Sequence, residues 1–156
     1  MTKEDFMRKA IDLATENVRK GDGGPFGAVI VKDGLIVAEA TNTVTSTIDP
    51  TAHAEVNAIR KACANLKTFD LSGCVIYSSC EPCPMCLSAL YWAHVDKIYI
   101  SATKRIAAKA GFDDAFIYKE LDTPKARRRL QQESLLKEKG SQPFDLWNSM
   151  TDKIKY

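Results

Sequence analysis

The sequence predicts an α/β layered protein, with helices packed against a mixed sheet. Two observations lead to this prediction. The stretch FGAVIVKDGLIVAEAT places two β-branched runs on either side of Asp33-Gly34, which is a strong short-range signal for an antiparallel hairpin. The chain then alternates expected helices with further apolar strands, and strands joined by helical crossovers run parallel.

The expected elements follow in order along the chain. Apolar residues recur at helical spacing over residues 3–19, and the glycines of 21–24 end that helix. NTVTSTIDP is expected to be a loop and GFDDAFIYKEL to be irregular, while the tail SQPFDLWNSMTDKIKY is expected to be helical in part. Further helices are expected over 51–66, 84–92, 104–110 and 124–139, and further strands at CVIYSS and DKIYISAT.

Length and composition indicate one globular domain over residues 1–156. Apolar residues make up 45% and charged residues 27%, and the net charge of +2 is too balanced for a broad nucleic-acid surface. No apolar run reaches the length of a membrane helix, and the N-terminus does not resemble a signal peptide. The five cysteines, an odd number in a long chain, indicate reduced thiols and a cytoplasmic protein without membrane partners.

Glu55 occupies an unusual position in the expected helix over 51–66. On a helical wheel it lies near the middle of the apolar side, among Ala58, Ile59 and Ala62. Burying an unpaired carboxylate is costly, so the position requires a reason. Two interpretations are open: a structural glutamate satisfied by donors, or a catalytic carboxylate that faces a buried site.

The pair Cys83-Pro-Met-Cys86 lies at an expected junction between a strand and a helix, where the helix dipole favours thiolates. Such a pair binds zinc, performs redox chemistry, or has no chemical role. A [4Fe–4S] site that also used Cys80 would lack the fourth cysteine just downstream. Cys63 and Cys74 are out of register and are expected to be small core residues.

A zinc site formed by one histidine and two cysteines explains several features together. His53, Cys83 and Cys86 supply three ligands, and three protein ligands with an open fourth position are typical of catalytic zinc. A histidine alone is more often a surface or hydrogen-bonded residue. Glu55, close to His53, is suited to carry protons for a water activated at the open position.

The stretches HAE at 53–55 and PCPMC at 82–86 resemble the signature of the zinc-dependent cytidine and nucleobase deaminase superfamily. The resemblance extends from the first helix to about residue 118. It implies a cytidine-deaminase-like three-layer sandwich, in which helices cover both faces of a mixed five-stranded sheet. It also implies one Zn²⁺ per chain on His53, Cys83 and Cys86, with Glu55 as the catalytic acid and base and with Cys80 not a ligand.

Within the superfamily the chain is most similar to bacterial guanine deaminases, in GDGGPFGAVIVKDG, DPTAHAEVNAIRKAC, CEPCPMCLSALYWA, AGFDDAFIYKE and the C-terminal tyrosine. This similarity implies hydrolysis of guanine to xanthine and ammonia. Phe26 would pack on the face of the purine and Asn42 would hydrogen-bond its ring. Ala54 would line the pocket, Asp114 would contact the guanine edge and help to move protons, and Tyr156 would close the site.

The similarity to bacterial guanine deaminases also implies a homodimer. Residues from about 141 to 156 would be exchanged between two subunits, so that Tyr156 acts in the partner's site. Residues 124–147 match that family only weakly.

Each substrate contact also has a simpler interpretation. Asn42 is a suitable turn residue at a strand end, Asp113 and Asp114 are suitable loop acids, Tyr156 is a chain terminus and Phe26 is a core residue.

Other functions remain open at this stage. Guanosine or another free base or nucleoside is a close alternative substrate. A tRNA adenosine deaminase shares the zinc motif, but it would need basic residues near its pocket, and KARRR at 125–129 is the only dense basic run. A non-enzymatic module with this fold would be expected to lose the glutamate, which is present here.

Overall fold

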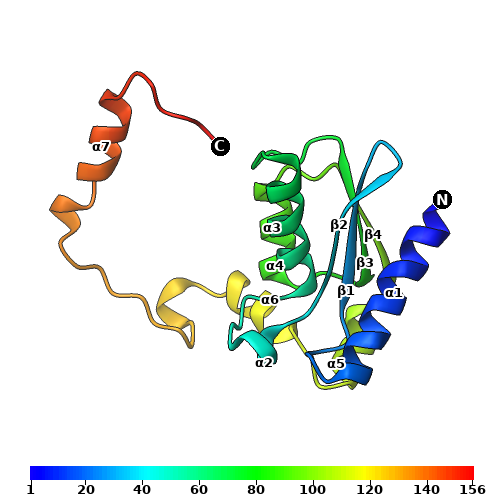
Figure 1. Cartoon of the computed structure of the whole chain (residues 1–156). Helices are drawn as coiled ribbons and strands as arrows, with labels where there is room; N and C mark the ends of the chain where they lie inside the picture. The colour runs from blue at the N-terminus through cyan, green and yellow to red at the C-terminus, as the bar shows by residue number, and fades with distance from the viewer. The chain divides into compact units, whose positions relative to one another are not determined.

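The computed structural model describes every residue from Met1 to Tyr156, and the chain forms two compact units, Met1–Asp114 and Ala115–Tyr156. The first unit holds the whole sheet with five of the helices around it (Figure 1). No helix in the chain has both the length and the apolar character that a membrane crossing requires.

The sheet is mixed, as predicted, and its strands lie in the order β2-β1-β3-β4. β1 pairs antiparallel with β2 and with β3, whereas β3 and β4 run parallel. The predicted fifth strand is wrong, because the sheet has four strands. The strand bounds are β1 Gly27–Lys32, β2 Leu35–Thr41, β3 Cys74–Cys80 and β4 Lys97–Ala102.

Helices cover both faces of the sheet, which confirms the predicted layers. On one face α1 (Lys3–Lys20) packs through Phe6 and Ala10 against Tyr77 and its neighbours. The approach is close at Gly27, where an added Cβ would lie 2.3 Å from the carbonyl oxygen of Ala10. On the other face α3 (Ala54–Leu66) and α4 (Pro84–Trp92) enclose the larger core.

Short helices connect the larger elements of the first unit. The segment expected to be a loop after β2 contains one helical turn, α2 (Val44–Thr47). α5 (Lys104–Lys109) follows β4, as predicted. Gly111 follows its C-cap residue Ala110 with a φ of +96°, and the backbone N–H of Gly111 donates to the Ala108 carbonyl, which closes the helix with a left-handed residue.

The second unit corrects two predictions. The stretch expected to be irregular contains α6 (Ala115–Asp122), because Phe116, Ile117 and Leu121 recur at helical spacing rather than alternating as in a strand. The charged helix expected over 124–139 is absent, since its apolar residues are exposed and a short helix without a partner is marginal. Only the turns η1 (Lys125–Arg127) and η2 (Lys137–Lys139) form there, and α7 (Gln142–Ser149) follows.

Candidate active site

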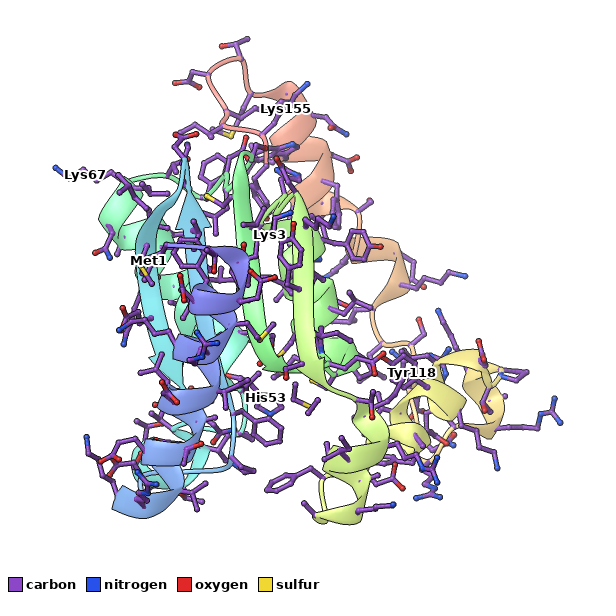
Figure 2. All side chains as sticks on the ribbon, turned by 90° about the vertical axis from the view of Figure 1, so that its right-hand side faces the viewer. Met1, Lys3, His53, Lys67, Tyr118 and Lys155 are labelled. Carbon is purple, nitrogen blue, oxygen red and sulfur yellow. The ribbon has the colours of Figure 1, made fainter.

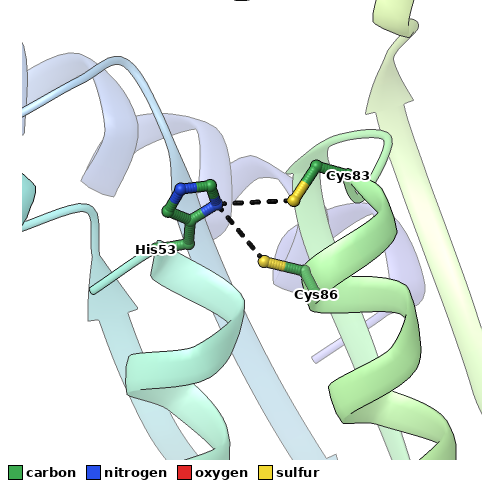
Figure 3. Close-up of side chains that lie close together, drawn as sticks. All are labelled: His53, Cys83 and Cys86. Atoms are coloured by element: carbon green, nitrogen blue, oxygen red, sulfur yellow. Dashed lines mark hydrogen bonds between the residues drawn. The ribbon is translucent and has the colours of Figure 1, made fainter. Parts of the chain in front are cut away.

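Three predicted metal ligands come together where α3 and α4 begin. His53 is the N-cap residue of α3, Cys83 is the N-cap residue of α4, and Cys86 lies in the first turn of α4. Nδ1 of His53 lies 3.6 Å from Sγ of Cys83 and 3.4 Å from Sγ of Cys86 (Figure 3). All three ligand atoms lie within 4.8 Å of one another.

These distances fit a tetrahedral zinc ion. Zinc bonds of about 2.3 Å to sulfur and about 2.0 Å to nitrogen, at a tetrahedral angle, separate the two donor atoms by about 3.5 Å. The observed separations of 3.4 and 3.6 Å therefore match zinc ligation through Nδ1 of His53. Cys80 does not belong to the cluster, and its buried Sγ lies 3.8 Å from the carbonyl oxygen of Thr103.

The two ligand thiols have opposite pKa shifts. The thiol of Cys86 and the imidazole of His53 stabilise the Cys83 thiolate, lowering the pKa of Cys83 to about 4 against the effect of its own burial. The pKa of Cys86 is raised, first by the same contact with Cys83 and then by burial. The protonation of each thiol therefore depends on the other, and ligation of zinc requires both as thiolates.

Glu55 lies two residues after His53, in the first turn of α3, and is only 5% exposed. The hydroxyl of Ser78 on β3 donates a 3.2 Å hydrogen bond to its Oε1 atom. Burial is the largest cause that raises the pKa of Glu55, and contacts that include the Cys86 thiol oppose it. A carboxyl group in this environment is suited to take up and release a proton.

Asn42 follows the end of β2, and its side chain is held in one orientation. Oδ1 accepts hydrogen bonds from the backbone N–H groups of Gly24 at 3.3 Å and Val44 at 3.1 Å. This network assigns the amide so that the NH₂ group carries the remaining hydrogen-bonding capacity. Asn42 is 6% exposed, its bond from the N–H of Val44 is the contact expected of a turn residue at a strand end, and its role toward a substrate stays a prediction.

Phe26 is half-buried just before β1, and it contacts another aromatic ring. Its ring meets that of Phe112 edge-on, with centroids 5.0 Å apart and planes at 87°. Gly24 leaves room for the Phe26 ring, since an added Cβ there would lie 3.2 Å from its Cδ2 atom. The sequence did not lead to a prediction of Phe112 as a site residue. Its position directly after Gly111 was a usable signal, because a residue that follows a glycine at a helix end often makes an apolar contact.

The other three predicted residues differ in how they are placed. Ala54 is fully buried at the first position of α3, where a backbone N–H has no partner within the helix. Asp114 is half-buried, burial raises its pKa, and the Cys83 thiolate acts in the same direction. Tyr156 is 79% exposed at the end of the second unit, and its role in the pocket stays a prediction.

Comparison with known proteins matches residues 1–102 to the family of the cytidine and deoxycytidylate deaminase zinc-binding region. The chain is 51% identical to the guanine deaminase of Bacillus subtilis over the full length of both proteins. It is 39% identical to the tRNA-specific adenosine deaminase of Aquifex aeolicus over 91% of each. The crystal structure of the Bacillus subtilis guanine deaminase matches 100% of this chain and 99% of its own with a TM-score of 0.97.

Proposed function

The chain belongs to the zinc-binding family of cytidine and deoxycytidylate deaminases, and on this premise we propose that it hydrolyses guanine to xanthine and ammonia. The observation that carries the proposal is the 51% identity with a guanine deaminase over the whole of both chains. It extends beyond the family region of residues 1–102 into the segments where substrate contacts are expected.

The site residues divide into ligands and a proton carrier. We propose that His53, Cys83 and Cys86 hold one zinc ion, which when bound supplies a Lewis acid and lowers the pKa of water at its open position to about 7. Glu55 takes the proton from the attacking water and delivers it to the ring nitrogen beside C2. The same carboxylate then takes the remaining proton from the new hydroxyl on C2 and passes it to the departing 2-amino group, so that the C2–N bond breaks, ammonia leaves and the oxygen stays on C2 as a carbonyl.

Recognition of the base follows from the groups around this cluster. The NH₂ group of Asn42 donates to an acceptor on the purine ring, because its Oδ1 is already engaged. The ring of Phe26 stacks on the base, and Ala54 bounds the pocket. The carboxyl of Asp114 contacts the amino edge of guanine, and its raised pKa suits a part in proton transfer.

A tRNA substrate has less support. The match to a tRNA-specific adenosine deaminase is lower in identity than the match to guanine deaminase. In the basic run, the guanidinium of Arg128 donates to the backbone carbonyls of Thr123 at 2.8 Å and Leu121 at 3.2 Å. That side chain therefore stabilises its own loop through two of its five N–H donors.

We also propose a homodimer in which residues 141–156 of each subunit cover the other subunit's site. The second unit exposes a large share of its apolar side chains, which favours a partner surface. In α7 and the tail these exposed residues are Phe144, Leu146, Trp147, Met150, Ile154 and Tyr156. Five free thiols support a cytoplasmic location for this dimer.

A substrate panel tests the function. Zinc-loaded protein is incubated with guanine, guanosine, adenine, cytosine, cytidine and a tRNA anticodon stem-loop, and ammonia release is measured. Guanine is expected to react fastest. Turnover of another member without turnover of guanine would overturn the substrate assignment and leave the deaminase chemistry in place.

A further inference from the structure

The backbone around Asn42 is fixed from more than one direction. Its N–H donates a 3.1 Å hydrogen bond to the carbonyl oxygen of Phe26. Its carbonyl oxygen lies so close to the glycine loop that an added Cβ on Gly23 would approach it to 2.1 Å. The segments that carry Phe26 and Asn42 are therefore packed directly against each other.

Asn17 joins these two segments from the last turn of α1. It is 4% exposed, and its Nδ2 atom donates one hydrogen bond of 2.9 Å to the Gly24 carbonyl and one of 2.8 Å to the Asn42 carbonyl. Both hydrogens of the Asn17 amide are used. Both acceptors belong to the backbone around the side-chain amide of Asn42, which is proposed to contact the substrate. A buried amide with this double contact is specific to one geometry, because it joins the Asn42 carbonyl to the Gly24 carbonyl, which also accepts a 2.9 Å hydrogen bond from the N–H of Phe26.

We propose that Asn17 is a positioning residue, which holds the side-chain amide of Asn42 in the orientation that meets the purine. The proposal rests on the proposed function, since it assigns Asn17 to the substrate site of that reaction. The Gly24 N–H that orients Oδ1 of Asn42 lies in the same residue whose carbonyl accepts from Asn17. Loss of the Asn17 amide therefore removes one restraint on the backbone of Asn42 and one on Gly24, whose N–H is one of the two donors that fix the Asn42 side chain.

The experiment is a double-mutant cycle on the zinc-loaded full chain, with guanine as substrate. Asn17→Ala is expected to raise KM about tenfold with little change in kcat. Asn42→Ala is expected to raise KM at least as much, and the double variant should match Asn42→Ala alone, because Asn17 acts through Asn42. Asn65→Ala is the matched control, since Asn65 also donates from Nδ2 to a backbone carbonyl, that of Val37, but on an exposed surface.

Two results would overturn the proposal. One is a lower melting temperature for Asn17→Ala with KM unchanged, which is what a purely structural role predicts. The other is a double variant in which the two effects on KM multiply, which means that the residues act independently. If Asn17→Ala does not fold, Asn17→Gln, which keeps both N–H donors on a side chain one methylene longer, is expected to give a smaller rise in KM and enters the same cycle.

The cycle also separates this proposal from the proposed function. If the wild-type chain leaves guanine intact and deaminates another base of the panel, the guanine assignment fails. The cycle is then run on that base. A double variant equal to Asn42→Ala supports the role of Asn17, and effects on KM that multiply overturn it.

Discussion

The hydroxyl of Ser78 donates a 3.2 Å hydrogen bond to Oε1 of Glu55, and both side chains are buried. The next residue on β3, Ser79, makes a contact of a different kind, since its Oγ accepts a 3.0 Å hydrogen bond from the backbone N–H of Gly27. Successive side chains of a strand point to opposite faces, so two adjacent serines serve two different purposes. Ser78 orients the proposed proton carrier, Glu55, and Ser79 accepts the hydrogen bond of the first backbone N–H of β1.

These adjacent serines make a matched pair of variants. Ser78→Ala is expected to lower kcat about tenfold, because the carboxyl of Glu55 loses the donor that orients it. Ser79→Ala is expected to leave kcat unchanged and to cost about 1–3 kcal/mol of unfolding free energy, because it strands a buried N–H. Steady-state kinetics and thermal melting on both variants check this, and an equal loss of kcat in the two would contradict it.

Glu55 itself is tested by Glu55→Gln. Glutamine keeps the shape and can still accept from Ser78, but it cannot carry a proton. We expect kcat to fall by about 10²–10⁴-fold, with zinc content unchanged at about one per chain. Glu39→Gln is the control, since Glu39 pairs with Lys9 on the surface. Near wild-type activity for Glu55→Gln would remove it from the mechanism.

The most informative feature of the sequence was a polar residue on the apolar side of a helix. Glu55 was identified because it lies on an apolar helix stripe, and the structure places it at 5% exposure. Asn17 lies on the stripe of α1 in the same way, three residues after Ala14 and seven after Ala10, and the sequence analysis missed it. Its hydrogen-bond partners are the backbone carbonyls of Gly24 and Asn42, which the helical pattern around Asn17 does not predict.

Local patterns were least informative in the second unit. The helix expected over 124–139 had charge, a starting proline and a terminal glycine, but no apolar face with a partner to pack on. The fifth strand was implied by resemblance alone, and the structure has no strand after β4. The alternation of strands and helices up to β4 was predictable because α1, α3, α4 and the strands between them contribute apolar side chains to the two cores of the sheet. Figure 2 draws all side chains as sticks on the ribbon.

The cysteines are expected to separate into two classes by metal content. Cys83→Ser and Cys86→Ser should each lose most of the bound zinc, because hydroxyl oxygen is a poor replacement for thiolate. Cys80→Ser should retain about one zinc per chain, since its sulfur lies outside the ligand cluster. Metal analysis after dialysis under reducing conditions decides this. Zinc loss in Cys80→Ser, or iron in the wild-type protein, would sink the assignment.

Phe112 is expected to affect substrate binding through Phe26. Phe112→Ala removes the edge-on contact at 5.0 Å and should raise KM for guanine about three- to tenfold, while Phe112→Tyr should restore it. Ile106→Ala is the control, because Ile106 lines the same cavity of about 550 Å³ as the two rings. If Ile106→Ala raises KM as much as Phe112→Ala, the effect belongs to the cavity and not to the ring pair.

Tyr156 allows a direct test of subunit exchange by complementation. Glu55→Gln chains keep Tyr156, and Tyr156→Ala chains keep Glu55, so each homodimer is expected to be impaired. If the tail crosses between subunits, a mixed dimer contains one site with the Glu55 of one chain and the Tyr156 of the other. Refolding the two variants together should therefore recover activity above the sum of the separate preparations. Without exchange no complete site can form, and the mixture should stay at that sum.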